Sequence, residues 1–461
     1  MQIPTARGYV TDVPYVWSFI RQTAPAWLDH VALVAGVAPP EREGRFTWCD
    51  LGCGHGLTAA ILAATHPEGS FHGIDGMPAH IDSACRFASE AGIPNINFHA
   101  ADFDDAADLD FPSFDYIVSQ GVYTWVGERA RLSWRRFIDR YLKPGGLLYV
   151  SYNAMPGRAA DLPLQRLVWA VGRSKPGNSR EQLTTALGVV RSMVGLKVPA
   201  LVSSPMANEV TERGERFDPG YLMHEFMVPE WDPACVTEVR AFLADIGLKP
   251  AGSATLVENY DSFVLGRAAR EALAAIGDAD AREMARDYFI DQFFRRDVFI
   301  RDGLRLDENE RRRRLLQSTF FLAKPVAGIE YGMSTAAGHL RFDNAVARHI
   351  VNALAAGPRR LADIAEPSTT EPSIPNQDLL ANTLTLGASL AVWPVEGSRA
   401  SVERLNAAIC KRLGGAEEIR FLALPCGTAL PAGRDLLTRL RDGNCAGDEY
   451  SSWVQFQLNR S

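Results

Sequence analysis

Long apolar runs are missing from this sequence. Its 461 residues contain no run of the roughly 18 uninterrupted apolar residues that a membrane-spanning helix requires. The segment from Met1 to Val10 also lacks a basic region followed by an apolar core, the pattern of a secretory signal. We therefore expect a cytoplasmic protein without membrane insertion.

Patterned cysteines and an excess of positive charge are missing as well. The seven cysteines form no CxxC pair and no Cys/His spacing of a zinc site, which predicts reduced thiols and no metal. A net charge of -7 and a pI near 5.8 are not typical of surfaces that neutralise phosphates. We therefore expect no nucleic-acid partner.

An alternation of strand-like and helical stretches is present from Phe46 to Tyr152. The strand-like runs are FTWCDLG, FHGID, INFHAAD, FDYIVS and LLYVSY, and helical stretches begin near Leu57 and Ala79. This alternation predicts an α/β fold with a Rossmann-like, mostly parallel sheet covered by helices on both faces. Ligands of such sheets bind at the carboxyl ends of the strands.

The rest of the chain indicates three further parts, because 461 residues exceed a single core. Residues 1–40, rich in aromatics, predict a helical lid on the α/β domain of residues 41–157, whose sheet is completed by later strands to about residue 266. Residues 158–337 predict a mainly helical middle domain. Residues 338–461 show helix, turn, helix and short strands, which predicts a small winged-helix-like domain.

The strongest motif is the sequence DLGCGHG, placed between a predicted strand and a predicted helix. Asp50, Gly52, Cys53 and Gly54 are its candidate ligand-binding residues. Its glycine spacing differs from the G-x-G-x-x-G of dinucleotide sites, and an acid precedes it. An ordinary glycine-rich turn is the alternative, whereas the acid and the loop amides suit the ammonium and carboxylate of S-adenosylmethionine.

Acidic residues follow the next two strands. Asp75 lies 19 residues after Gly56, where a carboxylate can accept the ribose hydroxyls of a nucleoside. Asp102 can accept an adenine amino group while Met77 or Phe103 packs on the ring. A helix-capping role for Asp75 is the alternative.

The ends of the fourth and fifth strands carry polar and aromatic residues. The fourth runs into QGVYTWV, where Gln120 and Gly121 are candidate cofactor contacts and Tyr123 and Trp125 form a candidate aromatic wall. Tyr152 and Asn153 end the fifth strand and are further candidates for lining an acceptor site. Burial in the core is the alternative for these aromatics.

These motifs together resemble the class I S-adenosylmethionine-dependent methyltransferases, with D-x-G-x-G-x-G at 50–56 and LKPGG at 142–146. More narrowly, GVYTWV (121–126), SYNAMPG (151–157) and YLMHEF (221–226) are similar to bacterial methyltransferases with a regulatory domain. Where that family commonly has Thr-His-Pro, this chain has Thr23-Ala24-Pro25. The best understood members methylate lysines of bacterial outer-membrane proteins.

The resemblance implies S-adenosylmethionine as cofactor, S-adenosylhomocysteine as product, and a protein-lysine acceptor. A small-molecule or natural-product N- or O-methyltransferase remains an alternative, as does a cofactor-binding regulatory protein with little activity. We expect Tyr15 to close over the cofactor and His224 with Glu225 to reach the cleft as base and orienter, a hydrogen-bonded helix pair being the alternative. A homodimer is one option for the assembly.

Overall fold

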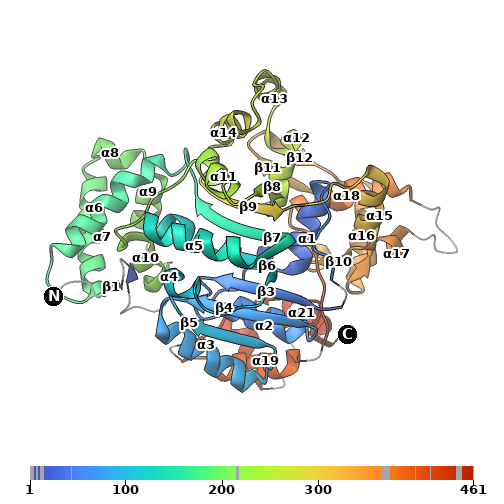
Figure 1. Cartoon of the computed structure of the whole chain (residues 1–461), viewed down its shortest axis with the longest axis horizontal. Coiled ribbons are helices and arrows are strands. Elements are labelled where there is room, and N and C mark those ends of the chain that lie inside the picture. The colour runs from blue at the N-terminus through green and yellow to red at the C-terminus, as the bar shows by residue number, and fades with distance from the viewer. Residues whose placement is uncertain are drawn as a thin grey trace.

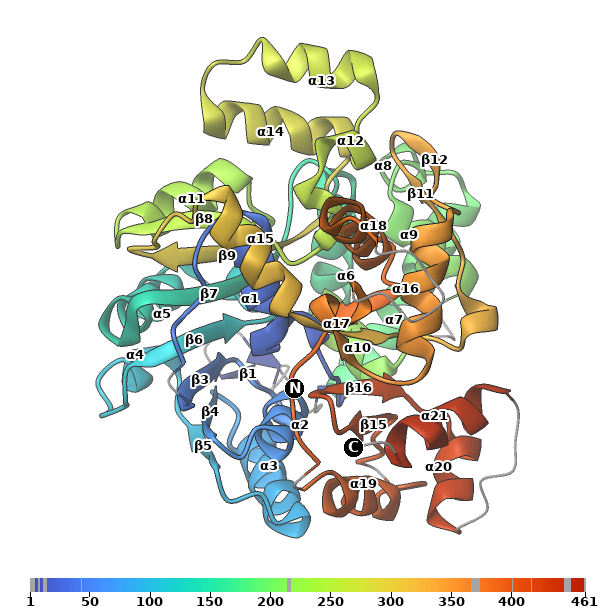
Figure 2. The ribbon, with the colours of Figure 1, turned by 90° about the vertical axis from the view of Figure 1, so that its right-hand side faces the viewer.

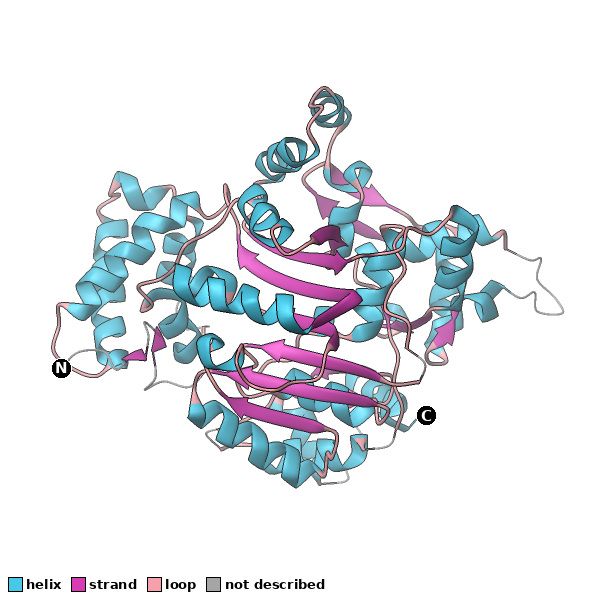
Figure 3. Ribbon diagram, in the orientation of Figure 1, coloured by secondary structure: helices cyan, strands magenta, loops and turns pink. Residues whose placement is uncertain are grey.

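A seven-stranded sheet forms the centre of the molecule (Figures 1 and 3). The computed structural model describes residues 5–6, 9–10, 15–42, 44–213, 217–365, 374–399, 401–415, 417–442 and 449–459. In spatial order the strands of the sheet are β5 (Ile96–Ala100), β4 (Gly69–Asp75), β3 (Phe46–Leu51), β6 (Phe114–Ser119), β7 (Leu142–Asn153), β9 (Phe294–Arg301) and β8 (Leu248–Ser253).

The pairing confirms the Rossmann-like prediction. Strands β5, β4, β3, β6 and β7 are parallel, whereas β9 runs antiparallel to both β7 and β8. Strand β3 is buried on both faces because its side chains alternate, with Trp48 in the core on one side and Cys49 in the core on the other.

Helices cover the two faces of the sheet. The core that contains Trp48 includes side chains of α1 (Pro25–Val34), α2 (Leu57–Thr65) and α3 (Pro78–Ala91). The core that contains Cys49 includes side chains of α4 (Phe103–Ala106), α5 (Glu128–Tyr141) and α11 (Val236–Ala244). The glycine loop lies between β3 and α2, at the carboxyl edge of the sheet.

The sheet continues further along the chain than the sequence predicted. Its last strand, β9, ends at Arg301, well beyond residue 266 and inside the segment expected to be helical. Arg295 and Asp297 interrupt the apolar pattern from which a buried strand is predicted. Both side chains are nevertheless buried and hydrogen-bonded to each other at 3.0 Å. A buried charge is tolerated when it is paired.

A separate helical body lies beside the carboxyl ends of the parallel strands (Figure 1, left). It has its own apolar core, which includes Leu164, Leu183 and Met223. Its helices are α6 (Leu162–Arg173), α7 (Ser179–Gly195), α8 (Pro199–Val202), α9 (Pro205–Arg213) and α10 (Pro219–Phe226). This body is confirmed as helical and reaches the sheet edge where a ligand would sit.

A second group of helices continues the chain next to β8 and β9. It comprises α12 (Asp261–Val264), α13 (Arg267–Ala274) and α14 (Ala279–Ile290). Figures 1 and 2 show α13 and α14 projecting above the sheet.

Residues 338–461, expected to form one domain, divide between two places. The first part joins a three-stranded sheet with its own core, and the second joins the core around α2. The first group contains α15 (Glu308–Gln317), β10 (Thr319–Leu322), the hairpin β11 (Gly332–Thr335) and β12 (Gly338–Arg341), α16 (Ala345–Ala355), β13 (Arg359–Arg360), α17 (Leu361–Ala365), α18 (Asn376–Ala388) and β14 (Val392–Pro394). Its winged-helix character stays a prediction.

The second group lies beside α2 and α3 (Figure 2). It contains α19 (Val402–Lys411), β15 (Phe421–Leu424), β16 (Thr428–Pro431), α20 (Arg434–Arg441) and α21 (Glu449–Asn459). Glu417 accepts hydrogen bonds from Ser83 at 2.7 Å and Arg86 at 3.0 Å, and Arg412 pairs with Glu90 at 2.6 Å. The end of the chain therefore supports the helices that follow the glycine loop.

The N-terminal segment is not a lid throughout. Helix α1 is buried, with Trp27 and Val31 in the sheet core and the Trp27 indole donating to the Ala254 carbonyl at 2.9 Å. The apolar face of α1 explains this position, because exposing that face to water would cost free energy. The short strands β1 (Thr5–Ala6) and β2 (Tyr9–Val10) pair ahead of it, and residues 1–4, 7–8 and 11–14 of the expected lid lie outside the described residues.

Among the described ranges, no helix is long and apolar enough to cross a bilayer. In the same part of the chain no group of three or more His, Cys, Asp or Glu residues is arranged to hold a metal ion.

Buried histidines predict acid-sensitive folding. Burial lowers the pKa of His30 to about 4, below the value near 6.5 of an unfolded histidine. The stability that the neutral ring contributes is therefore present above about pH 6.5 and is lost as the pH falls toward 4. Urea unfolding should show a loss of up to about 1.4 kcal/mol per pH unit from this group.

The substitution His30→Gln removes this titration and should flatten the decline of unfolding free energy with acidification. The exposed His339 offers a control, because His339→Gln should leave the slope unchanged. An identical pH slope for His30→Gln and the wild type would contradict the assignment.

Candidate active site

The glycine loop makes the tight turn that its sequence predicted. Gly52, Gly54 and Gly56 all have positive φ, at 89°, 54° and 68°. A Cβ on Gly52 would lie 2.4 Å from Val122, and one on Gly56 would lie 2.3 Å from Phe98. A Cβ on Gly54 would meet nothing within 4 Å, so Gly54 faces open space. The loop thus presents bare backbone to a ligand.

Asp75 holds this loop in place from the end of β4. Its Oδ2 accepts the Gly54 N–H at 2.9 Å, and its Oδ1 accepts the Met77 N–H at 2.9 Å. His80 Nδ1 lies 3.2 Å from Oδ1. A carboxylate can accept about four hydrogen bonds, so these three contacts leave capacity for one ribose hydroxyl. The ribose role stays a prediction.

Asp50 is the residue whose environment calls for a positively charged partner. It is 7% exposed, and its Oδ1 has no hydrogen-bond partner among the described residues. Burial, and then the nearby Asp75, raises the pKa of Asp50 to about 8. An ammonium group beside it would satisfy Oδ1 and favour the ionised carboxylate, which fits the methionine end of S-adenosylmethionine.

Other predicted cofactor residues have clear structural partners. Cys53 donates its N–H to the Ile74 carbonyl at 3.0 Å, and Gly121 donates to Ser151 Oγ at 2.8 Å. Gln120 accepts a hydrogen bond from Tyr149 at 2.5 Å. These bonds fix the loops at the ends of β3 and β6.

The three residues predicted to contact adenine have different surroundings from one another. Asp102 is the N-cap of α4 and accepts the Asp105 N–H at 3.0 Å. Met77 is buried beside the loop, whereas Phe103 is partly buried and packs against the core that contains α5. An adenine role for these three residues stays a prediction.

Tyr15 lies against the glycine loop, and its closing over a cofactor stays a prediction. Its N–H donates to His80 Nε2 at 3.2 Å, and its carbonyl accepts from His55 Nε2 at 3.0 Å. The His55 ring in turn stacks on Trp17 with centroids 4.7 Å apart. No role was predicted for His55 and His80 from the sequence, although His55 lies within DLGCGHG itself.

Tyr15 also brings helix α10 to the loop. Its ring meets His224 edge-on, with centroids 5.2 Å apart. Burial and the charge of Glu225 raise the pKa of Tyr15 to about 12, and Tyr221 donates a hydrogen bond to Glu225. Tyr15, Tyr221, His224 and Glu225 are named here the α10 cluster. These contacts place α10 beside the glycine loop, and a role of His224 and Glu225 in the cleft as base and orienter stays a prediction.

The α10 cluster contains one carboxyl group, Glu225, and its pKa is raised. Burial, opposed by Arg158 and by the Tyr221 hydroxyl, raises the pKa of Glu225 to about 7. The same burial and the Glu225 charge raise the pKa of Tyr221. A carboxyl group that titrates near neutrality is suited to exchange protons with a substrate.

The predicted aromatic wall is divided between two cores. Tyr123 is buried in the core that contains α5, against Trp134 at 5.8 Å. Trp125 is buried in the helical body and stacks on Trp231 at 5.8 Å. The two rings point to different cores from one short 3-10 turn, η2 (Tyr123–Trp125), so they do not form one wall.

Tyr152 and Asn153 are likewise structural in this fold. Tyr152 is fully buried and its hydroxyl donates to Asp297 at 2.6 Å. Asn153 is 2% exposed, and its amide nitrogens lie 3.3 and 3.4 Å from Thr124 Oγ1. Their prediction as acceptor-lining residues is corrected by this burial, because such side chains are satisfied inside the protein.

Two family models match the chain. Residues 43–179 match a methyltransferase domain, and residues 218–301 match a domain described as a predicted methyltransferase regulatory domain. An uncharacterized protein of Synechocystis is 30% identical over 433 residues, which cover 93% of this chain and 86% of that protein. The chain belongs to the S-adenosylmethionine-dependent methyltransferases that carry a regulatory domain.

Solved structures agree with the fold of this methyltransferase. PKMT2 from Rickettsia typhi in complex with AdoHcy superposes with a TM-score of 0.70, 18% identity, and coverage of 97% of this chain and 93% of that chain. The trans-aconitate 2-methyltransferase of Methylobacterium radiotolerans is 36% identical over 127 residues, or 28% of this chain and 44% of that protein. The match to the trans-aconitate 2-methyltransferase therefore covers only part of this chain.

Asp75→Ala in this methyltransferase should weaken S-adenosylmethionine binding by about 10- to 100-fold. The loss of a charge-assisted acceptor costs about 1.5 to 3 kcal/mol, and the loop also loses its anchor at Gly54. Calorimetric titration measures the change. Asp82→Ala, at an exposed position of α3, is the matched control.

The variant Gly54→Ala tests whether the cofactor binds in the open space beside Gly54. Its Cβ would meet no protein atom within 4 Å but would strain the backbone at a φ of 54°, so the fold should persist with a less stable loop while a bound cofactor is displaced. Unchanged affinity in both Gly54→Ala and Asp75→Ala would contradict the placement of the cofactor at this loop.

Proposed function

We propose that this methyltransferase transfers a methyl group to the side-chain amine of a lysine in a protein acceptor. Glu225 takes the proton that the lysine ammonium must lose. The observation that carries the proposal is the α10 cluster, in which a carboxyl group with a pKa near 7 lies among tyrosines beside the cofactor loop.

An amine acceptor needs this environment. A lysine ammonium has no free electron pair, so it must lose a proton before its nitrogen can act as a nucleophile. Bound S-adenosylmethionine supplies an electrophilic methyl group on a sulfonium. The rings of Tyr15 and Tyr221 suit an approaching cation, and the Glu225 carboxylate can accept its proton.

Arg158 and Asp161 tune this proton acceptor. The Arg158 guanidinium lowers the pKa of Glu225, while the Asp161 carboxylate raises it. Arg158 pairs with Asp161 at 3.1 Å, and this pair precedes helix α6. The balance leaves Glu225 able to be ionised before the acceptor arrives and protonated afterwards.

Two likenesses, together with the position of the helical body, support a protein acceptor. The helical body adjoins the loop through α10 at the carboxyl edge of the sheet, where substrates of such sheets bind (Figure 1). The motif resemblance described above implies a lysine acceptor as well. The fold likeness to PKMT2 spans nearly the whole of both chains, which includes the helical body.

The acceptor class is tested by incubating the purified protein with methyl-labelled S-adenosylmethionine. One arm contains lysate proteins, a second contains the same proteins with acetylated lysines, and a third contains extracted metabolites. Label in protein that lysine acetylation abolishes is expected. Label that appears in metabolites, or that persists after acetylation, would overturn the lysine assignment.

Glu225→Gln should lower kcat by about 10²- to 10⁴-fold without changing S-adenosylmethionine affinity, because it removes proton acceptance and leaves the loop intact. Glu209→Gln, at an exposed position in the same helical body, is the control and should retain wild-type kcat. Wild-type turnover in Glu225→Gln would exclude Glu225 as the proton acceptor.

The pH profile gives an independent reading of the same carboxylate. Activity should rise as the pH increases through about 7, where Glu225 ionises. Tyr221→Phe removes a hydrogen bond that lowers the pKa of Glu225, so the rise should move to higher pH. An unmoved profile would indicate that another group controls the rate.

A further inference from the structure

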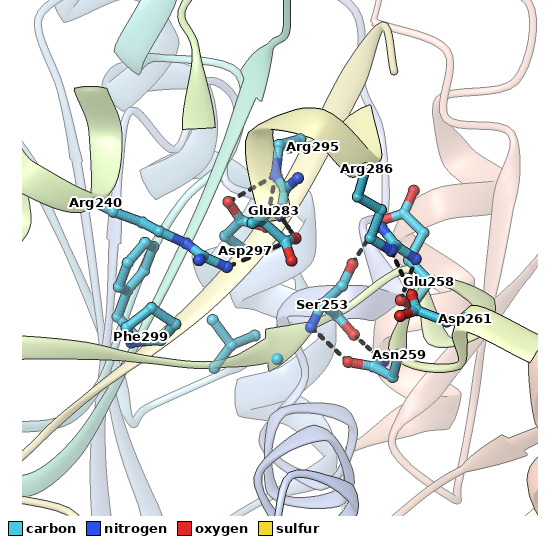
Figure 4. A pocket seen from close by; sticks show the side chains of 13 residues that line it. Arg240, Ser253, Glu258, Asn259, Asp261, Glu283, Arg286, Arg295, Asp297 and Phe299 are labelled. Atoms are coloured by element: carbon cyan, nitrogen blue, oxygen red, sulfur yellow. Dashed lines mark hydrogen bonds and ion pairs between the residues drawn. The ribbon is translucent and has the colours of Figure 1, made fainter. Parts of the chain in front are cut away.

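A polar cavity of about 330 Å³ lies away from the cofactor loop, on the antiparallel edge of the sheet (Figure 4). Strands β8 and β9, helices α11 and α14, and the turn η5 (Leu256–Asn259) supply its walls. Its size is within the range of small-molecule sites. All the lining residues lie between Arg240 and Phe299, within the segment that matches the regulatory domain.

The three guanidinium groups that line the cavity are all paired. Arg295 contacts Glu283 at 2.7 Å and Asp297 at 3.0 Å, and Arg286 contacts Asp261 at 2.7 Å. Arg240 pairs with Asp280 at 2.9 Å on the outer side. These pairs neutralise the arginines, so the cavity offers little to an anion.

Glu258 also lines the cavity, and its carboxylate takes part in none of these ion pairs. Its Oε2 accepts from Ser253 Oγ at 2.7 Å, and its Oε1 accepts from the Gln292 amide at 2.9 Å, both neutral donors. Among the described residues no Arg or Lys side chain lies within ion-pair distance of this carboxylate. Burial raises the pKa of Glu258, whereas the hydrogen bonds from Gln292 and Ser253 and the charge of Arg295 lower it.

Part of the cavity lining is apolar. Pro250, Val298 and Phe299 contribute to it, but Val298 and Phe299 are packed in the two cores of the sheet, at 0% and 1% exposed, and Figure 4 shows Phe299 on the far side from Glu258. Pro250 is exposed and its ring suits a short alkyl chain, whereas a bare metal ion would gain nothing from it. The described residues also contain no arrangement of three or more metal-ligating side chains.

We propose that this cavity binds a small organic cation, an ammonium or guanidinium on a short alkyl chain, with its charge at Glu258 and its chain against Pro250. The two carboxylate oxygens, each with one neutral donor already, retain capacity for the N–H groups of such a ligand. This site is separate from the lysine acceptor site and does not depend on it.

Calorimetric titration of the full chain with agmatine tests the proposal, because agmatine carries a guanidinium and an ammonium on one alkyl chain. Saturable binding is expected, with at least about tenfold weaker affinity in Glu258→Gln. Glu271→Gln, at an exposed position on α13, should bind as the wild type does. Acetate and butanol, an anion and a neutral chain, should not bind.

A crystal of the wild-type protein soaked in agmatine checks the location without any substitution. A nitrogen of the ligand should lie at hydrogen-bond distance from the Glu258 carboxylate. The proposal is overturned if agmatine does not bind, if Glu258→Gln binds it as tightly as the wild type does, or if the soaked ligand lies elsewhere.

Discussion

The hydrogen bonds of the Asp75 carboxylate organise the functional end of this molecule. One oxygen holds the glycine loop through Gly54, and the other holds the start of α3 through Met77. His80 extends this network, since its Nε2 accepts the Tyr15 N–H and its Nδ1 is then free to donate to Asp75. One carboxylate therefore positions both the cofactor loop and the segment that covers it.

The α10 cluster depends on this network. Because Tyr15 is fixed by His55 and His80, its ring meets His224 at a defined place on α10. The helical body is thereby joined to the loop by side chains far apart in the sequence. The helical body that carries Glu225 and the glycine loop belong to different parts of the fold, and Tyr15 joins them.

The antiparallel edge of the sheet follows a different physical rule. Strand β9 places Arg295 and Asp297 inside the protein, where Asp297 also accepts from Tyr152 on β7. Such a buried network is stable only when its members are mutually paired. It leaves Glu258 as a carboxylate with neutral donors, beside a polar cavity in the segment that matches the regulatory domain.

The sequence by itself determined the parallel strands, the glycine loop and the strand-end acids, because alternating burial and left-handed glycines leave local patterns. Asp50, Gly54 and Asp75 were found in this way. The tertiary structure brought Tyr15 and α10 together, since the contacts between them depend on packing across domains. It also placed Tyr123, Trp125 and Tyr152 in cores and revealed β9, whose paired charges make a buried strand look exposed.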